Sequence, residues 1–406
     1  QLLARALASL AVRLHKDLSC SQLHLCSREM STVTHIETGI IEASKSQDLA
    51  KLDQVLEQGV QRKKAFLKAC RFGDLKQTEL LLDEGAKING VDVQGATGLH
   101  HAVLGGHIQV AEALIKRGAN PNMTETQHGA APLHYAADQK NAECTAKLIK
   151  GGADCNVADL EGATPLHIAV QGGAVEVARA LIDGGGNVNA LTAAGATPLH
   201  FTAASGSKEM AELLVKAKAE VNTRDTGRGY AALHIAAASS NPGVVAVLVA
   251  ARAEIEARVK GDTALHIAAI WGGVEVCEAL IAGKADVNLP GNKRYSPLHL
   301  ATLYGHHTVA EMLIKNSADV NAENRNGETC MDQVLRRGEA AKEVKEVLRK
   351  HGALTKKELQ DKGPVLEEAQ VQKSNVKWFV ALCVALLACG VHVIWDRGLL
   401  SSVLDA

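Results

Sequence analysis

Short apolar helices separated by glycine and polar turns recur along most of the chain. In one segment, Thr164 stands where its hydroxyl can cap a helix, and Pro165 suits the first helical turn because it needs no backbone donor there. Gly172 and Gly173 end this helix and let the chain reverse. Apolar residues with a 3.6-residue period then predict a second helix over 175–183. Neither helix can bury its apolar side alone, so neighbouring units must stack.

The same block returns at a nearly fixed spacing. From residue 99 onward the dipeptide Leu-His occurs seven times, at a spacing of 32 to 34 residues between successive histidines. The surrounding block reads GATPLHIA at 162–169 and GATPLHFT at 195–202, and a phrase ending in asparagine, such as ADVN at 285–288, follows the second helix. A repeat of this length indicates an architecture of stacked units. The histidines are His100, His134, His167, His200, His234, His266 and His299.

The pattern resembles the ankyrin repeat family over roughly residues 39–354. The resemblance implies an all-α fold, a solenoid of stacked helix–turn–helix units that are joined by β-turn fingers. We expect about nine to ten units, with degenerate units at 40–60 and 65–89 and a closing unit at 326–353. In the closing unit Cys330-Met331 takes the place of Leu-His, and a highly charged second helix suits a cap with one solvated side.

Composition agrees with stacked short helices. Apolar residues make up 47% of the 406 residues but aromatic residues only 3%, which suits helices that approach closely and argues against an aromatic-rich sandwich or barrel. The net charge of -1 provides no field that would attract nucleic acid, so we expect no nucleic-acid partner. The nine cysteines form no CxxC pair, which predicts neither a disulfide framework nor a zinc site.

The repeated histidines are predicted to be structural. Repeats stack about 10 Å apart, whereas two ligands of one zinc ion approach within about 4 Å, so the histidines are expected to bond the backbone between repeats. The finger asparagines are expected to bond the backbone of their own turn, and the resemblance implies that such residues can be hydroxylated. No catalytic motif stands out, so we predict a non-enzymatic protein without metal or cofactor. The asparagines are Asn156, Asn189, Asn222, Asn288 and Asn321.

The variable positions predict where a partner binds. The resemblance implies binding through the fingers and the inner helix surface. The early fingers are acidic or neutral, through Glu125, Asp159 and Glu161, whereas the later fingers carry six basic residues against Asp225. Because arginine and aromatic residues dominate interface hot spots, we predict a partner segment that is acidic and has an apolar anchor. The alternative is that the fingers are solvated loops and that Trp271 fills a local gap. The candidate residues are Arg224, Arg228, Tyr230, Arg258, Lys260, Ile270, Trp271, Lys293, Arg294, Tyr295, Leu303 and Tyr304.

The C-terminal region changes in composition. A charged linker at 355–375 precedes 18 residues without charge at 378–395, which as a helix span roughly 27 Å. Trp378 and Trp395 bracket this stretch, as interfacial aromatics do. We therefore expect a single C-terminal transmembrane helix at 376–395 and a short tail at 396–406. The expected localisation is an intracellular membrane, single-pass, with the array in the cytosol. The alternative is a buried helix that docks on the array.

Residues 1–38 are predicted to be an extension outside the repeats. The stretch 1–29 is rich in Leu, Ala, Ser and Arg and has no acidic residue before Asp17, which resembles a transit peptide. The alternative is a non-native or disordered extension, with Met30 as the start of the protein.

These observations together predict a non-enzymatic scaffold or adaptor. In this hypothesis a monomeric ankyrin array recruits a protein partner through a rigid surface, and the membrane tether raises the effective concentration. One alternative is a regulatory or targeting-receptor subunit that holds an enzyme or client at the membrane. Another is a fragment of a larger ankyrin-bearing membrane protein.

Overall fold

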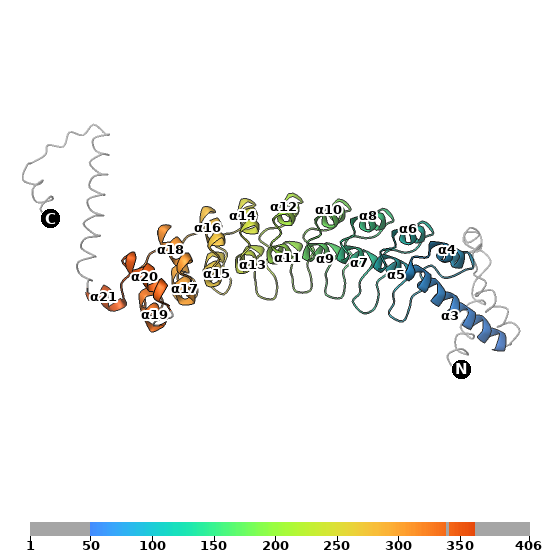
Figure 1. Cartoon of the computed structure of the whole chain (residues 1–406), viewed down its shortest axis with the longest axis horizontal. Helices are drawn as coiled ribbons and strands as arrows, with labels where there is room; N and C mark the ends of the chain where they lie inside the picture. The colour runs from blue at the N-terminus through green and yellow to red at the C-terminus, as the bar shows by residue number, and fades with distance from the viewer. Residues whose placement is uncertain (1–48, 338–340, 362–406) are drawn as a thin grey trace, which may run out of the picture. The chain divides into compact units, whose positions relative to one another are not determined.

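The computed structural model describes residues 49–337 and 341–361, and side chains from residue 57 onward (Figure 1). The described residues form helices and turns without a strand, apart from isolated bridges such as Arg224 with Ala231. The helices are α3 (Leu49–Phe72), α4 (Leu75–Asp83), α5 (Gly98–Leu104), α6 (Ile108–Lys116), α7 (Pro132–Asp138), α8 (Ala142–Lys150), α9 (Pro165–Gln171), α10 (Val175–Asp183), α11 (Pro198–Ser205), α12 (Lys208–Lys216), α13 (Ala232–Ala238), α14 (Pro242–Ala250), α15 (Ala264–Trp271), α16 (Val274–Ala282), the 3-10 turn η2 (Asn292–Arg294), α17 (Pro297–Tyr304), α18 (His307–Lys315), α19 (Cys330–Arg337), α20 (Lys342–Lys350) and α21 (Lys356–Asp361).

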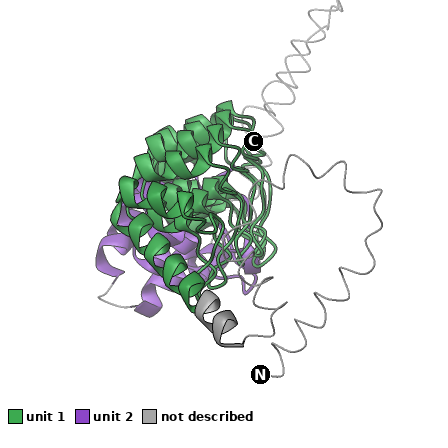
Figure 2. Cartoon of the chain, turned by 90° about the vertical axis from the view of Figure 1, so that its right-hand side faces the viewer, with its two compact units in different colours: residues 1–268, 275–285 green, residues 269–274, 286–406 purple. Residues whose placement is uncertain are grey.

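The chain divides into two compact units, coloured green and purple in Figure 2. Of the described residues, unit 1 holds 49–268 and 275–285, and unit 2 holds 269–274, 286–337 and 341–361.

Unit 1 consists of two rows of short helices (Figure 1). The helices that follow the fingers, α5, α7, α9, α11 and α13, contact one another in order and form the finger-side row. The second helices α4, α6, α8, α10, α12 and α14 form the outer row, and α3 packs against both α4 and α5. Each row buries one leucine per repeat, and full burial of a leucine stabilises the fold by about 1.5–3 kcal/mol. These leucines are Leu99, Leu114, Leu133, Leu148, Leu166, Leu181, Leu199, Leu214, Leu233 and Leu248.

The local signals of the sequence explain where these helices begin and end. Helix α9 begins at Pro165, directly after Thr164, as predicted. Gly173 reverses the chain at φ +70°, and a Cβ there would meet no atom within 4 Å. Backbone conformation rather than crowding therefore favours glycine at this turn. Thr164 is the N-cap of this helix and forms a capping box with His167, and its hydroxyl bonds Nδ1 of His167 at 3.0 Å.

The repeated histidines join neighbouring repeats, which confirms their predicted structural role. Nδ1 of His167 accepts the backbone N–H of Thr164 at 3.1 Å, so the ring proton lies on Nε2. Nε2 then donates to the Ala196 carbonyl of the next repeat at 3.2 Å. Burial lowers the pKa of this histidine and keeps the ring neutral. The same bond joins His100 to Ala130, His134 to Ala163, His200 to Tyr230, His234 to Ala257 and, in unit 2, His299 to Glu328.

The finger asparagines also bond the next repeat, so the prediction that they bond their own turn is wrong. Nδ2 of Asn156 donates to the Gly185 carbonyl at 3.1 Å, and Oδ1 accepts the Asn187 N–H at 2.7 Å. The turn itself is held by Asp154, whose carboxylate accepts the Asn156 N–H at 2.8 Å. Because Asp154 already satisfies that N–H, the asparagine side chain reaches across to the neighbour. Asn189, Asn222, Asn288 and Asn321 likewise accept from the repeat that follows.

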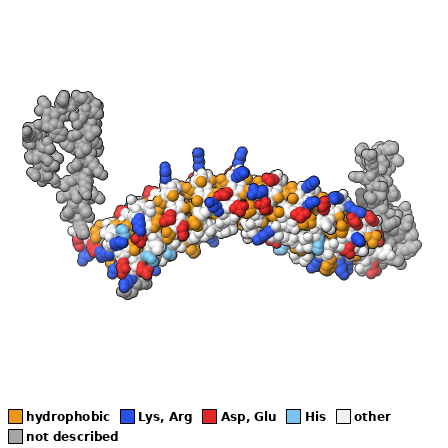
Figure 3. All heavy atoms as spheres, turned by 45° about the horizontal axis from the view of Figure 1, so that its top comes forward, with side chains coloured by type: hydrophobic (Ala, Val, Ile, Leu, Met, Phe, Trp, Pro, Cys, Tyr) orange, Lys and Arg blue, Asp and Glu red, His pale blue; other side chains and the backbone are white. Residues whose placement is uncertain are grey.

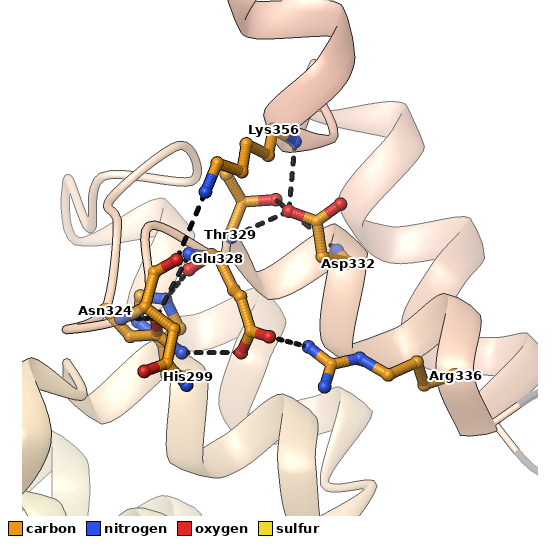
Figure 4. Close-up of polar contacts among 8 residues, drawn as sticks. His299, Asn324, Glu328, Thr329, Asp332, Arg336 and Lys356 are labelled. Carbon is orange, nitrogen blue, oxygen red and sulfur yellow. Dashed lines mark hydrogen bonds and ion pairs between the residues drawn. The ribbon is translucent and has the colours of Figure 1, made fainter.

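Unit 2 ends in a modified repeat, in which α19 and α20 pack against each other and against α17 and α18, respectively. Thr329 directly precedes α19, so Asp332 occupies the histidine position, and the predicted match of Cys330-Met331 with Leu-His is one residue out of register. Oδ2 of Asp332 accepts the Thr329 N–H, as the histidines accept theirs, and also accepts the Lys356 N–H, both at 2.9 Å (Figure 4). An acceptor is needed here because the start of α21 offers an N–H instead of a carbonyl.

The structure corrects the prediction of a transmembrane helix. Within residues 49–337 and 341–361, no helix is both long and apolar enough to cross a membrane. The longest, α3, has 24 residues but contains charged residues such as Arg62, Lys63 and Lys64. The predicted span 376–395, the tail 396–406 and the extension 1–38 lie outside the described residues. The fold prediction is therefore wrong in its transmembrane part, and the predicted single-pass localisation in an intracellular membrane is wrong as well.

Candidate partner-binding surface

Two exposed aromatic rings mark the surface of unit 2. Trp271 ends α15 and is 62% exposed, and Tyr304 ends α17 and is 52% exposed. Each ring directly precedes a glycine with a left-handed backbone, Gly272 at φ +76° and Gly305 at φ +87°. Because the helix stops at the glycine, no following turn covers the ring. The two positions are equivalent in consecutive repeats, as the sequence predicts.

The chain around these rings is held in place by a histidine. His306 places Nε2 2.9 Å from the carbonyl oxygen of Ile270, which ties the end of α15 to the start of α18. A Cβ at Gly272 would lie 2.6 Å from Nδ1 of the same ring, so only glycine fits there. Ile270 and Leu303, which directly precede the exposed rings in the sequence, are half-buried. The aromatic side chains thus project from a fixed backbone.

The finger of unit 2 carries two exposed cations on a strained backbone. Lys293 has φ +52° and Arg294 has φ +61°, within the turn η2. Arg294 corresponds to Gly162, the left-handed glycine of another finger. Each stands three residues before the proline of the Pro-Leu-His helix that follows it. A non-glycine residue in this conformation costs about 1–2 kcal/mol. Among the described residues, neither cationic group forms a hydrogen bond or ion pair.

Unit 1 holds the other basic finger residues. Arg224 donates from Nη1 to the carbonyl oxygen of Arg258 at 2.9 Å, and Arg258 donates to the Gly261 carbonyl at 3.0 Å. Arg224 therefore joins two neighbouring fingers, whereas Arg258 holds its own finger. Arg228 and Lys260 are exposed. The twelve candidate residues are thus divided, with five in unit 1 and seven in unit 2.

Two of the candidate tyrosines support the buried histidines. The ring of Tyr230 meets His234 edge-on at 6.1 Å, and Tyr295 meets His299 edge-on at 5.8 Å. Both tyrosines are only half-buried, so one side of each ring stays accessible. Phe201 makes the same contact with His167 at 5.5 Å. These rings shield the hydrogen-bonded imidazoles. This role of the aromatic residues cannot be read from their residue type alone.

Three exposed residues were missed from the sequence. Arg325 and Arg337 add positive charge to unit 2, and Nη2 of Arg337 lies 4.0 Å from the Cβ position of Gly305, beside Tyr304 in the chain. Phe72 in unit 1 is 68% exposed and directly precedes the left-handed Gly73, just as the two exposed rings of unit 2 directly precede left-handed glycines. Counting back from each left-handed glycine could have found Phe72.

The molecular face drawn in Figure 3 has no patch of a single charge sign, because acidic and basic side chains alternate there. On the outer row, Glu112 pairs with both Lys116 and Lys147, at 3.1 and 3.2 Å. Exposed pairs of this kind contribute little to stability and leave little net charge. The fingers and helix ends are therefore the better candidates for selective binding.

Comparison with known proteins agrees with the repeat architecture. The family described as ankyrin repeats (3 copies) matches residues 40–125, 133–225, 185–259, 233–324 and 274–354. A 57-residue segment is 42% identical to the ADP-ribosylation factor GTPase-activating protein AGD4 of Arabidopsis thaliana and 44% identical to AGD2 of the same plant. Each match covers 14% of this chain and 7% of the relative.

Proposed function

As a member of the ankyrin repeat family, the chain is a protein-interaction scaffold, and we propose that unit 2 binds an acidic partner segment with an apolar anchor. The single observation that carries this proposal is the presence of exposed Trp271 and Tyr304 in the same unit as Lys293 and Arg294. The rings offer apolar area, and the cations offer charge that no described residue neutralises.

The chemistry of these groups selects the partner. An apolar side chain that covers the rings removes both from water, and central aromatic residues usually dominate binding energy. A carboxylate can accept two parallel hydrogen bonds from the Arg294 guanidinium, whereas Lys293 acts as a point charge. The fixed backbone around Trp271 lowers the entropy that binding must remove.

Backbone strain at Arg294 supports the same proposal. Glycine would adopt φ +61° without cost, and equivalent fingers contain glycine, for example Gly162 and Gly195. Strained residues concentrate where their side chains serve a function. We infer that the guanidinium at this finger is retained for binding.

The similarity to AGD4 and AGD2 supports only the shared repeat. The matched 57 residues are fewer than two repeats of the 32 to 34 residues seen here. We therefore do not extend GTPase activation to this chain, and the absence of enzymatic activity stays a prediction.

A binding experiment with a defined peptide tests the proposal. The probe is a fluorescein-labelled peptide with Glu-Phe-Glu between Gly-Ser flanks, and the comparison peptide has Lys-Phe-Lys. Trp271→Ala is expected to weaken binding of the acidic peptide about 30-fold, the effect of losing a hot spot of about 2 kcal/mol. Leu80→Ala, at an apolar site in unit 1 that is 50% exposed, is the control and should bind as wild type does. Equal affinity of Trp271→Ala and wild type, or equal binding of both peptides, contradicts the proposal.

A further inference from the structure

We propose a second binding site, in unit 1, for a basic segment of another protein whose arginine or lysine enters a cavity between two fingers. This site goes beyond the proposed function because it uses other residues and selects the opposite charge. The cavity has a volume of about 500 Å³ and lies between the fingers that precede α7 and α9 and those two helices.

The two fingers that form the cavity are fixed to each other. The backbone N–H of Leu160 donates to the His128 carbonyl of the preceding finger at 2.8 Å. A Cβ at Gly129 would lie 3.0 Å from Cγ of Leu160, so the leucine side chain lies against that glycine. Leu160 nevertheless is 71% exposed. The rim of the cavity therefore offers apolar area that a partner can cover.

The charge of the cavity is negative. Its lining includes the carboxylates of Asp138, Asp159 and Glu161 and no lysine or arginine. Asp138 and Glu161 are exposed, and Asp159 is fixed because its Oδ1 accepts the N–H groups of Glu161 and Ala163 at 2.9 and 2.8 Å. A cation that enters would meet carboxylates contributed by both walls.

A buried carboxylate behind the lining adds to this charge. Glu125 is only 4% exposed, and its side chain accepts N–H groups of the neighbouring finger residues Gln127, His128 and Ala130. Burial raises the pKa of this carboxyl, but the backbone N–H groups outweigh it, so the pKa is lowered overall and the charge persists at neutral pH.

The apolar walls specify the kind of cation. Tyr135 and Ile168 are half-buried in the lining. A guanidinium is planar and weakly hydrated, so it can lie on an aromatic ring while it donates to carboxylates. A lysine side chain suits this cavity less well, because its ammonium group is a compact, strongly hydrated charge. Burial, Glu125 and Asp92 raise the pKa of Tyr135, which agrees with a negative potential at this ring.

A peptide-binding measurement on the full chain tests the site. The probe is a fluorescein-labelled Arg-Leu-Arg peptide with Gly-Ser flanks, and Glu-Leu-Glu and Gly-Leu-Gly peptides are the comparisons. We expect the arginine peptide to bind at least about tenfold more tightly than either, as two exposed charge pairs and one apolar contact allow. The double variant Asp138→Asn, Glu161→Gln should reduce this affinity about tenfold, and Leu160→Ser should reduce it about fivefold.

The controls separate this site from nonspecific charge and from unit 2. Glu209→Gln removes an exposed acid of α12 in the same unit and should leave the affinity unchanged. The acidic peptide used for unit 2 is measured in the same samples, so failure of one site is distinguished from failure of the other. The proposal is overturned if the wild-type chain does not prefer the arginine peptide. It is also overturned if the double variant and the Leu160→Ser variant both bind this peptide as tightly as wild type does.

Discussion

The histidines that join the repeats make the free energy of unfolding depend on pH, and His167→Gln isolates one of them. In the folded chain His167 is a neutral ring that accepts from Thr164 and donates to Ala196, and burial lowers its pKa. In the unfolded chain a histidine titrates near pH 6.5. The unfolded state therefore binds a proton first, so this contribution to stability is present above about pH 6.5 and is lost as the pH falls.

The size of the effect follows from proton linkage. A histidine that titrates near 6.5 in the unfolded state and at a lower pH in the folded state loses at most about 1.4 kcal/mol of stability between pH 7.5 and 5.5. His167→Gln removes the ring, and its unpaired buried groups cost about 2–3 kcal/mol at pH 7.5. The glutamine does not titrate, so the difference between wild type and variant should shrink by up to about 1.4 kcal/mol at pH 5.5.

Urea unfolding followed by circular dichroism at both pH values measures this difference. Gln171→Ala is the control, because it changes an exposed side chain that does not titrate, and its difference from wild type should stay constant. The reasoning is refuted if the gap between wild type and His167→Gln is the same at both pH values, or wider at pH 5.5.

Two further predictions concern the repeats. Asn156→Ala removes two bonds to the next repeat and should lower the free energy of unfolding by about 1–2 kcal/mol in urea, against no change for the exposed Gln171→Ala; equal stability of both variants contradicts the inter-repeat role. Gly272→Ala places a Cβ 2.6 Å from His306 and should lower the melting temperature more than Gly173→Ala, which has open space and costs about 1 kcal/mol through its backbone alone. The opposite order would show that the His306 contact is unimportant.

Local patterns account for what the sequence predicts correctly. The helix starts, the glycine turns and the histidine role follow from residues within one repeat and from the period between repeats. The asparagine role could not be read this way, since Asp154 and Asn156 both suit a turn and only the packed neighbour shows which one holds it. The register of the last repeat is obscured because Asp332 replaces a histidine.

The binding surfaces are predictable only in part. The exposed rings of unit 2 follow from the register of Trp271 and Tyr304, and the strain at Arg294 could be suspected wherever arginine replaces a finger glycine. The cavity in unit 1 depends on how Leu160 and Glu161 of one finger face Tyr135 of another repeat, and this arrangement exists only in the packed structure. Several finger acids, such as Asp159, also prove to hold their own turns.

The most direct test of the central claim measures two properties of Arg294→Gly. Relief of the left-handed strain should raise the free energy of unfolding, by up to about 1 kcal/mol after the entropy of glycine is subtracted. Loss of the guanidinium should weaken binding of the Glu-Phe-Glu peptide about tenfold, as expected for a charged hydrogen bond. The account predicts that stability rises while affinity falls. A variant that is less stable and binds the acidic peptide as tightly as wild type would contradict it.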